Sequence, residues 1–223
     1  MPVIQLGKGA IRGPAATLAL LAIFAAIAAA LSYWRPSISG PMVASGVLWL
    51  AFIVYWSKAS KNAALAKTAE SAESRRVHEL MMNGALLLLF IPIPGLRYVY
   101  LPPSPVWVPL GLGLQAGFFG LAAWSRKHLG RNWSGRIEIK LGHELVRSGP
   151  YRVLRHPIYT AMLGMFAGTA IVSGTIHALL AVALIMAAYA RKIGMEESTL
   201  RQSFGPEYEN YRRSSWALIP GLF

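Results

Sequence analysis

The sequence contains no cysteine, and this absence removes several kinds of chemistry from consideration. Without thiols the chain can form no disulfide, bind no metal through thiolate and use no cysteine nucleophile. Charged residues are also scarce, at 14% of the chain, whereas an ordinary soluble domain has about 25%. With 55% hydrophobic residues and a mean hydropathy of +0.44, the composition is that of a membrane protein.

Acidic residues are few as well. Nine Asp and Glu stand against 22 Lys and Arg, which gives a net charge of +13 over 223 residues. In a soluble protein such an excess would favour nucleic acid. Here the basic residues fall between apolar segments, so membrane topology explains them better and no nucleic-acid partner is expected. The length allows one or two domains.

Apolar segments occur near residues 13–34, 41–57, 80–100, 105–125 and 158–190. A helix needs about 20 apolar residues to cross a bilayer. The run 15–31 is too long for the core of a cleavable signal peptide, so we expect it to form a first membrane helix. Pro92 and Pro94 break the third segment, whose helix should therefore begin in the polar stretch before Leu80.

The last apolar segment is too long for one crossing. Its 33 residues would extend roughly 50 Å as one helix, and Ser173-Gly174-Thr175 at its middle favours a turn. We therefore predict a hairpin of two antiparallel helices of about 15 residues each. The polar stretch 58–79 reads as a helix extending from the second crossing.

The charges indicate the topology. Twenty of the 22 basic residues lie in the N-terminal stretch, in 58–79, in 126–157 and after residue 190. With six crossings all of these regions fall on one side, which the positive-inside rule makes cytoplasmic. The predicted fold is all-α: a polytopic integral membrane protein with about six transmembrane helices, a C-terminal hairpin and cytoplasmic termini. Residues 1–125 would form an N-terminal region of four crossings, and 126–223 a region with the hairpin and a cytoplasmic C-terminal helix.

The stretch Arg147–Tyr159 carries the densest group of polar and backbone-shaping residues. Pro150 and Pro157 restrict the backbone, and Gly149 allows a tight turn. Pro157 also suits the first turn of the helix that follows. Taken alone, an Arg at a membrane helix end is usually a snorkelling anchor and a single His is usually structural.

A second polar group, Glu196-Glu197, follows the hairpin. Alone it is typical of the solvated start of a helix, where acidic side chains suit the helix dipole. Beyond it, helix spacing places one set of side chains on a common face: Leu200, Phe204, Tyr208 and Tyr211. Gly205 and Pro206 should interrupt that helix.

Together these parts resemble a known signature. Arg155-His156-Pro157-Ile158-Tyr159, an apolar hairpin and Glu196-Glu197 look like the RHPxY–hydrophobic–EE pattern of the isoprenylcysteine carboxyl methyltransferase family. Gly149-Pro150-Tyr151 resembles its GPY lead-in, and Phe204–Tyr211 its FGxxYxxY tail. The resemblance covers about residues 126–223 and is specific for the superfamily, much less for the substrate. Members are integral-membrane enzymes that use S-adenosylmethionine.

The resemblance implies a cofactor pocket formed by the 143–159 loop, the hairpin ends and the C-terminal helix. The implied cofactor-binding residues are His143, Leu145, Val146, Gly149, Tyr151, Arg155, His156, Pro157, Tyr159, Glu196 and Glu197. His156 and Tyr159 would lie near the adenosyl or methionine portion, and one of the two glutamates would contact the ribose or the amine. Replacing Glu197 with Ala should then abolish cofactor binding while the fold survives. No metal site is expected.

The implied catalytic residues are His156 and Arg191. In relatives an Arg close before the acidic pair helps to hold the substrate carboxylate, and here Arg191 and Lys192 both precede Glu196. Methyl transfer depends mainly on proximity and orientation. A carboxylate, thiolate or phenolate acceptor would need little base catalysis, whereas an amine or hydroxyl would need His156 or another base.

The expected function is S-adenosylmethionine-dependent methyl transfer to a lipophilic acceptor, such as the carboxylate of a prenylated cysteine. The acceptor would enter sideways from the bilayer lipids and the cofactor from the cytoplasm, at the plasma membrane of a prokaryote or the endoplasmic reticulum of a eukaryote. Two alternatives remain open. One is an NADPH-dependent membrane reductase of the sterol type, and the other is a non-enzymatic membrane scaffold whose basic loop binds anionic lipid.

Overall fold

Helices form the framework of the described part of the chain. The computed structural model describes residues 40–62, 66–91, 93, 96, 98–102, 104–140 and 144–221. The helices are α2 (Gly40–Ala59), α3 (Ala72–Phe90), α4 (Trp107–Leu129), α5 (Pro157–Ser173), α6 (Ile176–Phe204) and α7 (Pro206–Arg213). Three short 3-10 turns, at Ser60–Asn62, Gly130–Asn132 and Gly149–Arg152, link them. The predicted first membrane helix, near 13–34, lies outside the described residues.

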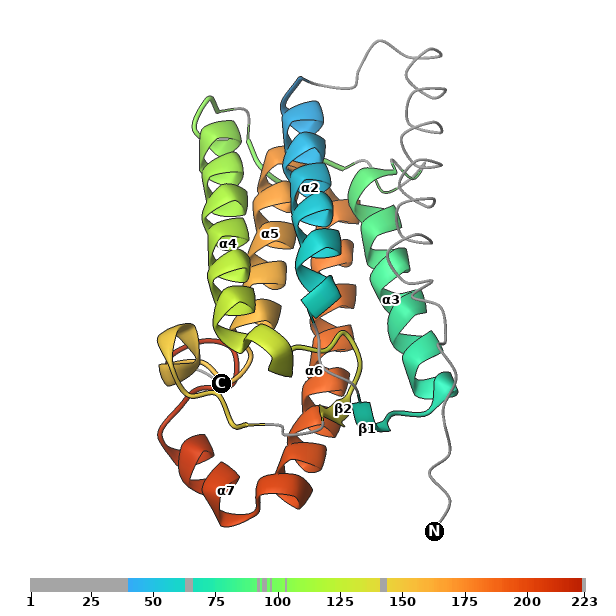
Figure 1. Ribbon diagram of the computed structural model, residues 1–223. Helices are drawn as coiled ribbons and strands as arrows, with labels where there is room; N and C mark the ends of the chain where they lie inside the picture. Colours follow the sequence, from blue (N-terminus) through green and yellow to red (C-terminus); the bar gives the residue numbers. More distant parts are fainter. Residues whose placement is uncertain are drawn as a thin grey trace. The chain divides into compact units, whose positions relative to one another are not determined.

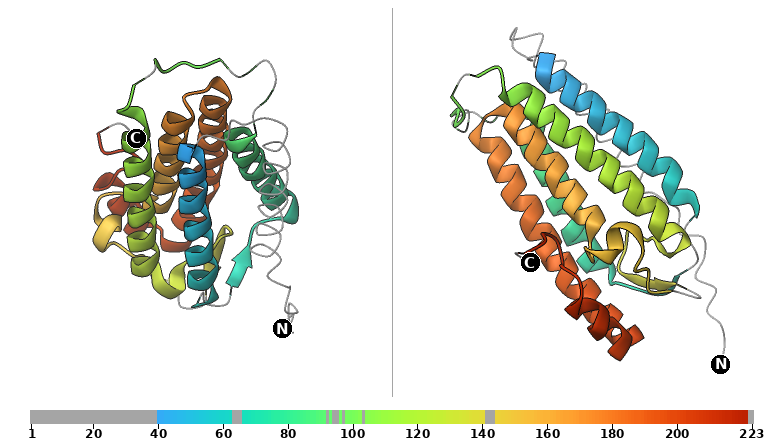
Figure 2. Two further views of the ribbon diagram at one scale, coloured as in Figure 1. Left: turned by 90° about the horizontal axis from the view of Figure 1, so that it is seen from above. Right: turned by 90° about the vertical axis from the view of Figure 1, so that its left-hand side faces the viewer.

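The apolar helices identify an integral membrane protein. By length and composition α2, α4 and α6 are each able to cross a membrane, and α5 is a shorter apolar helix. Figure 2 shows α2, α4, α5 and α6 running side by side. The total of six crossings stays a prediction.

The helix α3 begins where the sequence predicts, inside the polar stretch. The Ser71 side chain accepts a hydrogen bond from the Ser74 backbone N–H and so caps the first turn of α3. The helix ends at Phe90, two residues before Pro92. Its polar beginning and apolar remainder explain why the hydrophobic segment looks too short by itself.

The predicted hairpin is confirmed, with one correction to its second arm. Helix α5 ends at Ser173, Gly174 adopts a left-handed conformation with φ of 65°, and α6 begins at Ile176. However, α6 runs for 29 residues, about twice the expected length, to Phe204. The polar residues after Ala190 are mostly good helix formers without proline, so the helix continues. Glu196 and Glu197 thus lie inside α6, and the expectation of a new helix start there is wrong.

The predicted interruption after Phe204 is confirmed. Gly205 has a positive φ of 51°, and Pro206 occupies the first turn of α7. The break changes the direction of the chain, so α7 turns towards the start of α5 instead of extending α6 (Figure 1).

The expectation of a polar helix over 58–79 is wrong. Helix α2 ends at Ala59, and strand β1 (Ala66–Ala69) then pairs antiparallel with β2 (Glu138–Lys140). The Arg126 side chain donates to the Ala59 carbonyl at the point where α2 ends. The all-α framework is confirmed, and this short two-stranded pairing adds to it. It ties the 58–79 stretch to the loop that follows α4.

Small residues let α4 and α5 pack closely. A Cβ on Gly111 would lie 2.6 Å from the carbonyl oxygen of Gly168, so neither position has room for a side chain. Next to this contact, Ser45 Oγ donates to Gln115 Oε1 at 2.7 Å, and Gln115 Nε2 returns a bond to the Ser45 carbonyl at 3.0 Å. Such close approach and interhelical hydrogen bonding are how helices associate in lipid.

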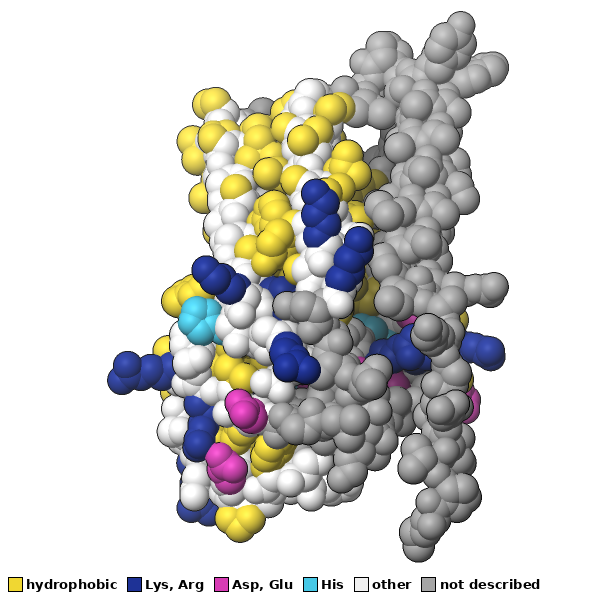
Figure 3. Space-filling view, in the orientation of Figure 1, with side chains coloured by type: hydrophobic (Ala, Val, Ile, Leu, Met, Phe, Trp, Pro, Cys, Tyr) yellow, Lys and Arg dark blue, Asp and Glu magenta, His cyan; other side chains and the backbone are white. Residues whose placement is uncertain are grey.

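The polar segments gather at one end of the bundle. The chain segments that follow α2, α4 and α6 all lie at the lower end in Figure 1. On the face drawn in Figure 3, Lys and Arg side chains lie in the middle and lower parts, and hydrophobic side chains cover the upper part of the helices. This separation is the one that the charge pattern predicts.

Candidate functional site

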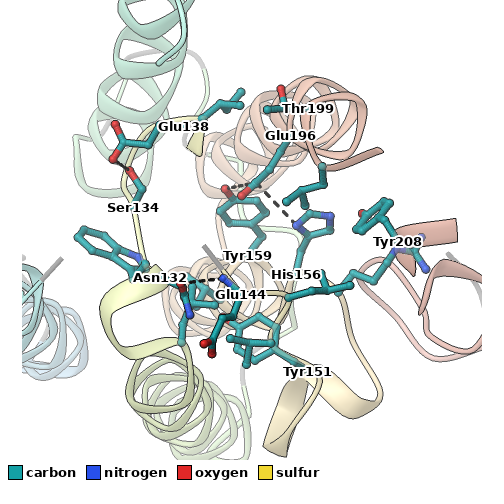
Figure 4. A pocket seen from close by; sticks show the side chains of 18 of the residues that line it. Asn132, Ser134, Glu138, Glu144, Tyr151, His156, Tyr159, Glu196, Thr199 and Tyr208 are labelled. Carbon is teal, nitrogen blue, oxygen red and sulfur yellow. Dashed lines mark hydrogen bonds and ion pairs between the residues drawn. The ribbon is translucent and has the colours of Figure 1, made fainter. Parts of the chain in front are cut away.

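A cavity opens at the polar end of the bundle, between the loop after α4, the start of α5, the end of α6 and α7 (Figure 4). Its volume is about 870 Å³ with the open mouth included. It is lined by Leu129, Asn132, Trp133, Ser134, Arg136, Ile137, Glu138, Glu144, Leu145, Val146, Tyr151, Arg155, His156, Ile158, Tyr159, Glu196, Thr199, Leu200, Tyr208 and Tyr211.

The structure brings most of the predicted cofactor residues to this cavity. Those that line it are Leu145, Val146, Tyr151, Arg155, His156, Tyr159 and Glu196. Three others do not line it, Gly149, Pro157 and Glu197, and neither does the predicted catalytic residue Arg191. His143 lies outside the described residues. Within the described ranges, no group of three or more His, Asp or Glu side chains is arranged to hold a metal ion.

Tyr159 and Glu196 form one wall of the cavity. The Tyr159 hydroxyl donates to Glu196 Oε2 at 2.7 Å. The Tyr159 ring stacks between His156, at a centroid distance of 5.4 Å, and Tyr189, at 4.6 Å. Pro157 begins α5 and places His156 just before its first turn and Tyr159 just within it. The hydrogen bond therefore joins the start of α5 to the polar end of α6.

His156 lies between the two glutamates. Its Nε2 is 3.3 Å from Glu197 Oε1, and its Nδ1 is 3.8 Å from Glu196 Oε2. The ring is buried and stacked on Tyr159. These contacts fix the position and orientation of the imidazole at the cavity wall.

Arg155 and Glu197 satisfy each other instead of facing the cavity as a free pair. Arg155 Nε donates to Glu197 Oε1 at 2.8 Å, and Arg155 Nη1 donates to the carbonyls of Arg212, at 3.1 Å, and Ser215. Arg201 adds a further charge 3.6 Å from Glu197. Of the acidic pair, Glu196 is thus the side chain at the cavity, and Glu197 joins α6 to α5 and to the C-terminal segment.

The segment after α7 supports the backbone of this wall, and no pattern in the sequence predicts it. Trp216 N–H donates to the Val153 carbonyl at 2.9 Å, and Arg155 N–H donates to the Trp216 carbonyl at 2.8 Å. His156 N–H donates to the Ala217 carbonyl at 3.1 Å. The backbone on which Arg155 and His156 stand is therefore held by residues some sixty positions later in the chain.

Gly149 does not line the cavity but affects it through the packing of the turn that carries Tyr151. Its φ is 56°, and a Cβ there would collide with the ring of His128 at the end of α4. The absence of a side chain lets the turn Gly149–Arg152 pack on α4 and present Tyr151. Tyr211 donates to the Tyr151 carbonyl at 2.6 Å. Burial raises the pKa of Tyr151 and raises that of Tyr211 to about 12, so both hydroxyls stay neutral at physiological pH.

Arg191 and Lys192 point to different partners. Arg191 Nη2 donates to Ser74 Oγ at 3.1 Å and so binds α6 to α3, away from the cavity. Lys192 is 6% exposed, donates to the Gly135 carbonyl at 2.9 Å, and lies 5.6 Å from the Tyr159 ring centroid. Neither cation lines the cavity, but Lys192 is the one that lies near the ring of the lining residue Tyr159.

The loop after α4 supplies polar lining that no motif predicted. Ser134 Oγ donates to Glu138 Oε1 at 2.6 Å, and the Glu144 N–H donates to Asn132 Oδ1 at 3.3 Å. The loop is polar in sequence, but no residue spacing in it predicts a binding site. Tyr208 was expected only as one member of a helix face, and it too lines the cavity.

Comparison with known proteins agrees with this geometry. A family model described as phospholipid methyltransferase matches residues 106–207. A probable protein-S-isoprenylcysteine O-methyltransferase of Oryza sativa subsp. indica is 34% identical over 86 residues, which is 38% of this chain and 45% of the relative. The corresponding Dictyostelium discoideum protein is 27% identical over 155 residues, or 65% of this chain and 63% of that one.

A solved structure gives the same result for the fold. The eukaryotic intramembrane Ras methyltransferase, isoprenylcysteine carboxyl methyltransferase, superposes with a TM-score of 0.54 and 18% identity, covering 89% of this chain and 74% of that chain. In sequence over part of its length, and in fold, this chain is similar to the isoprenylcysteine carboxyl methyltransferases. The resemblance predicted from the motifs is thus confirmed.

The chain is also similar to a protein with another name. A nickel-cobalt-cadmium resistance protein, NccN, of Alcaligenes xylosoxydans xylosoxydans is 33% identical over 121 residues, 52% of this chain and 53% of that protein. The chain spans about half the length of several of the curated relatives that it matches. These partial similarities therefore leave the acceptor to be argued from the site.

Proposed function

We propose that this protein is an S-adenosylmethionine-dependent membrane methyltransferase that acts on a lipophilic acceptor. The observation that carries the proposal is the Tyr159–Glu196 hydrogen bond of 2.7 Å at the cavity wall. It unites the two halves of the motif, which are 37 residues apart, in one site. The similarity to methyltransferases in the comparisons supports the same reaction class.

The chemistry of the cavity suits this cofactor. S-adenosylmethionine supplies an activated methyl group on a sulfonium and carries a net positive charge at neutral pH. Three carboxylates line the cavity, those of Glu138, Glu144 and Glu196. Of the lining arginines, Arg155 is already paired with Glu197. Glu196 can accept hydrogen bonds from an ammonium or a ribose diol.

The geometry favours Lys192 as the group that receives the acceptor. A buried ammonium beside the aromatic wall attracts a carboxylate. A carboxylate acceptor needs no base, so His156 would serve to position Tyr159 and Glu196. Since relatives are named for isoprenylcysteine, the carboxylate of a prenylated cysteine is the acceptor we propose. Arg191, bound to α3 through Ser74, would support the helix pair.

We further propose that the site faces the cytoplasm in a protein of six crossings. The basic loops lie at the same end as the cavity (Figures 1 and 3), and the positive-inside rule assigns such an end to the cytoplasm. Both termini would then be cytoplasmic. The cofactor would arrive from water and the acceptor from the bilayer.

The test is transfer of a labelled methyl group from S-adenosylmethionine to N-acetyl-S-farnesylcysteine by the purified protein in detergent. The proposal expects a base-labile methyl ester with the wild type and a strong loss of product with Glu196→Gln. Glu207→Gln is the matched control, because that side chain is half-exposed in a surface ion pair and should leave activity unchanged. Absence of ester from the wild type, with the cofactor bound, would reject this acceptor.

A further inference from the structure

The hydroxyl of Tyr208 lacks a hydrogen-bond partner within the described part of the chain, although the side chain is fully buried. The residue lines the cavity, at the α7 side. A buried hydroxyl without a partner is costly, roughly 1–3 kcal/mol in general. A protein that keeps such a group at a cavity wall has a use for it when the cavity is filled.

Tyr211 provides an internal comparison, three residues further along α7. The two rings pack edge to face with centroids 6.1 Å apart. Tyr211 donates to the Tyr151 carbonyl at 2.6 Å, so its hydroxyl is committed to the protein. The same helix thus holds one tyrosine that fixes the fold and one whose hydroxyl is uncommitted among the described residues.

The surroundings of Tyr208 identify the kind of ligand group that it can meet. Leu200 and Ile158 give the cavity apolar lining. Figure 4 shows Tyr208 beside His156, across the cavity from Asn132 and Glu138. Burial raises the pKa of Tyr208, so the group is a neutral donor at physiological pH. Apolar lining with one neutral donor suits an adenosyl group better than an ammonium or a carboxylate.

We propose that Tyr208 is a cofactor-binding residue whose hydroxyl donates a hydrogen bond to the adenosyl portion of bound S-adenosylmethionine. The inference rests on the proposed function, because it takes the cavity to be the cofactor site. It assigns α7 a direct part in binding, in addition to its part in the fold. The bond satisfies the hydroxyl only in the loaded protein.

The test compares Tyr208→Phe with Tyr211→Phe, each of which removes one oxygen atom. Thermal melting in detergent measures the ligand-free protein, and calorimetry measures the Kd of S-adenosylhomocysteine. The affinity for adenosine is measured by its displacement of S-adenosylhomocysteine. Tyr208→Phe should leave the ligand-free melting temperature unchanged or raised, because it removes an unsatisfied group. It should weaken S-adenosylhomocysteine and adenosine by the same factor, about five- to tenfold.

The control should behave in the opposite way. Tyr211→Phe should lower the melting temperature of the ligand-free protein, because it leaves the Tyr151 carbonyl without its donor. Wild-type affinity in Tyr208→Phe would overturn the inference alone, as would a loss confined to S-adenosylhomocysteine with adenosine unaffected. A failure of the wild type to bind S-adenosylhomocysteine would instead reject the proposed function and the inference with it.

Discussion

Arg155 and Glu197 form a nearly buried ion pair, with Nε and Oε1 2.8 Å apart and each side chain 10% exposed. The neighbouring Glu196 turns to the cavity and bonds Tyr159. Successive residues of a helix point about 100° apart, so two adjacent glutamates serve different purposes. One carboxylate holds the site together and the other is available to a ligand.

Replacement of Glu196 should therefore affect binding more than folding. Glu196→Gln keeps the size of the side chain but removes the charge that receives an ammonium or a ribose diol. Hydrogen bonds to charged groups contribute about 1.5–3 kcal/mol, or roughly 10- to 150-fold in affinity. Calorimetry with S-adenosylhomocysteine should show that loss, with a melting temperature close to that of the wild type. Unchanged affinity would remove Glu196 from the cofactor site.

Replacement of Glu197 should affect stability first. Glu197→Gln leaves Arg155 buried without its counter-charge, and breaking a buried pair costs about 3–5 kcal/mol. The residual exposure and the carbonyl partners of Arg155 place the expected loss at the low end of that range. Thermal melting of the ligand-free protein measures it.

The surface pair Arg147–Glu207 supplies the control for this variant. Both side chains are 50% exposed, so Glu207→Gln should change the melting temperature little. A Glu197→Gln protein that melts like the wild type yet binds no cofactor would restore the sequence-based expectation that Glu197 is the ligand.

Replacing each of the two cations before the acidic pair should change a different measured quantity. Lys192→Met should raise the KM of a prenylated carboxylate acceptor roughly tenfold, while the Kd of S-adenosylhomocysteine changes less. Arg191→Met should mainly lower stability, because it removes the bonds to Ser74 on α3. If Arg191→Met raised the acceptor KM and Lys192→Met did not, the assignment would revert to Arg191.

Helix packing in the apolar region can be tested with two glycines of α4. Gly111→Ala places a methyl group 2.6 Å from the Gly168 carbonyl and against Val172, so α4 and α5 must separate. We expect a loss of about 1–3 kcal/mol. Gly113 lies two residues further along α4, and a Cβ there meets nothing within 4 Å. Gly113→Ala should therefore be neutral or slightly stabilising. Equal melting temperatures for the two variants would contradict the close packing.

The sequence predicts the hairpin and the site motifs because both depend on local features. A long apolar run with Ser173-Gly174-Thr175 at its centre leaves few alternatives to two helices. The motif Arg155–Tyr159 places its residues at a helix start by the constraint of Pro157. Seven of the eleven cofactor residues that the likeness implies therefore lie at the cavity.

Other features depend on contacts between distant segments and leave no local pattern. The pairing of 66–69 with 138–140 and the docking of Trp216 on Val153 are backbone hydrogen bonds that any side chains permit. The choice between Glu196 and Glu197 depends on how α6 is rotated against α5. The uncommitted hydroxyl of Tyr208 depends on where α7 lies after Gly205. None of these relationships has a period or a spacing in the sequence.

Binding of S-adenosylhomocysteine to the purified protein in detergent tests the central claim most directly. Calorimetry should be run with S-adenosylhomocysteine and, on the same preparation, with NADPH. The account predicts micromolar binding of S-adenosylhomocysteine, weakened by Glu196→Gln, and no binding of NADPH. Binding of NADPH alone would contradict the account and assign the cavity to a reductase.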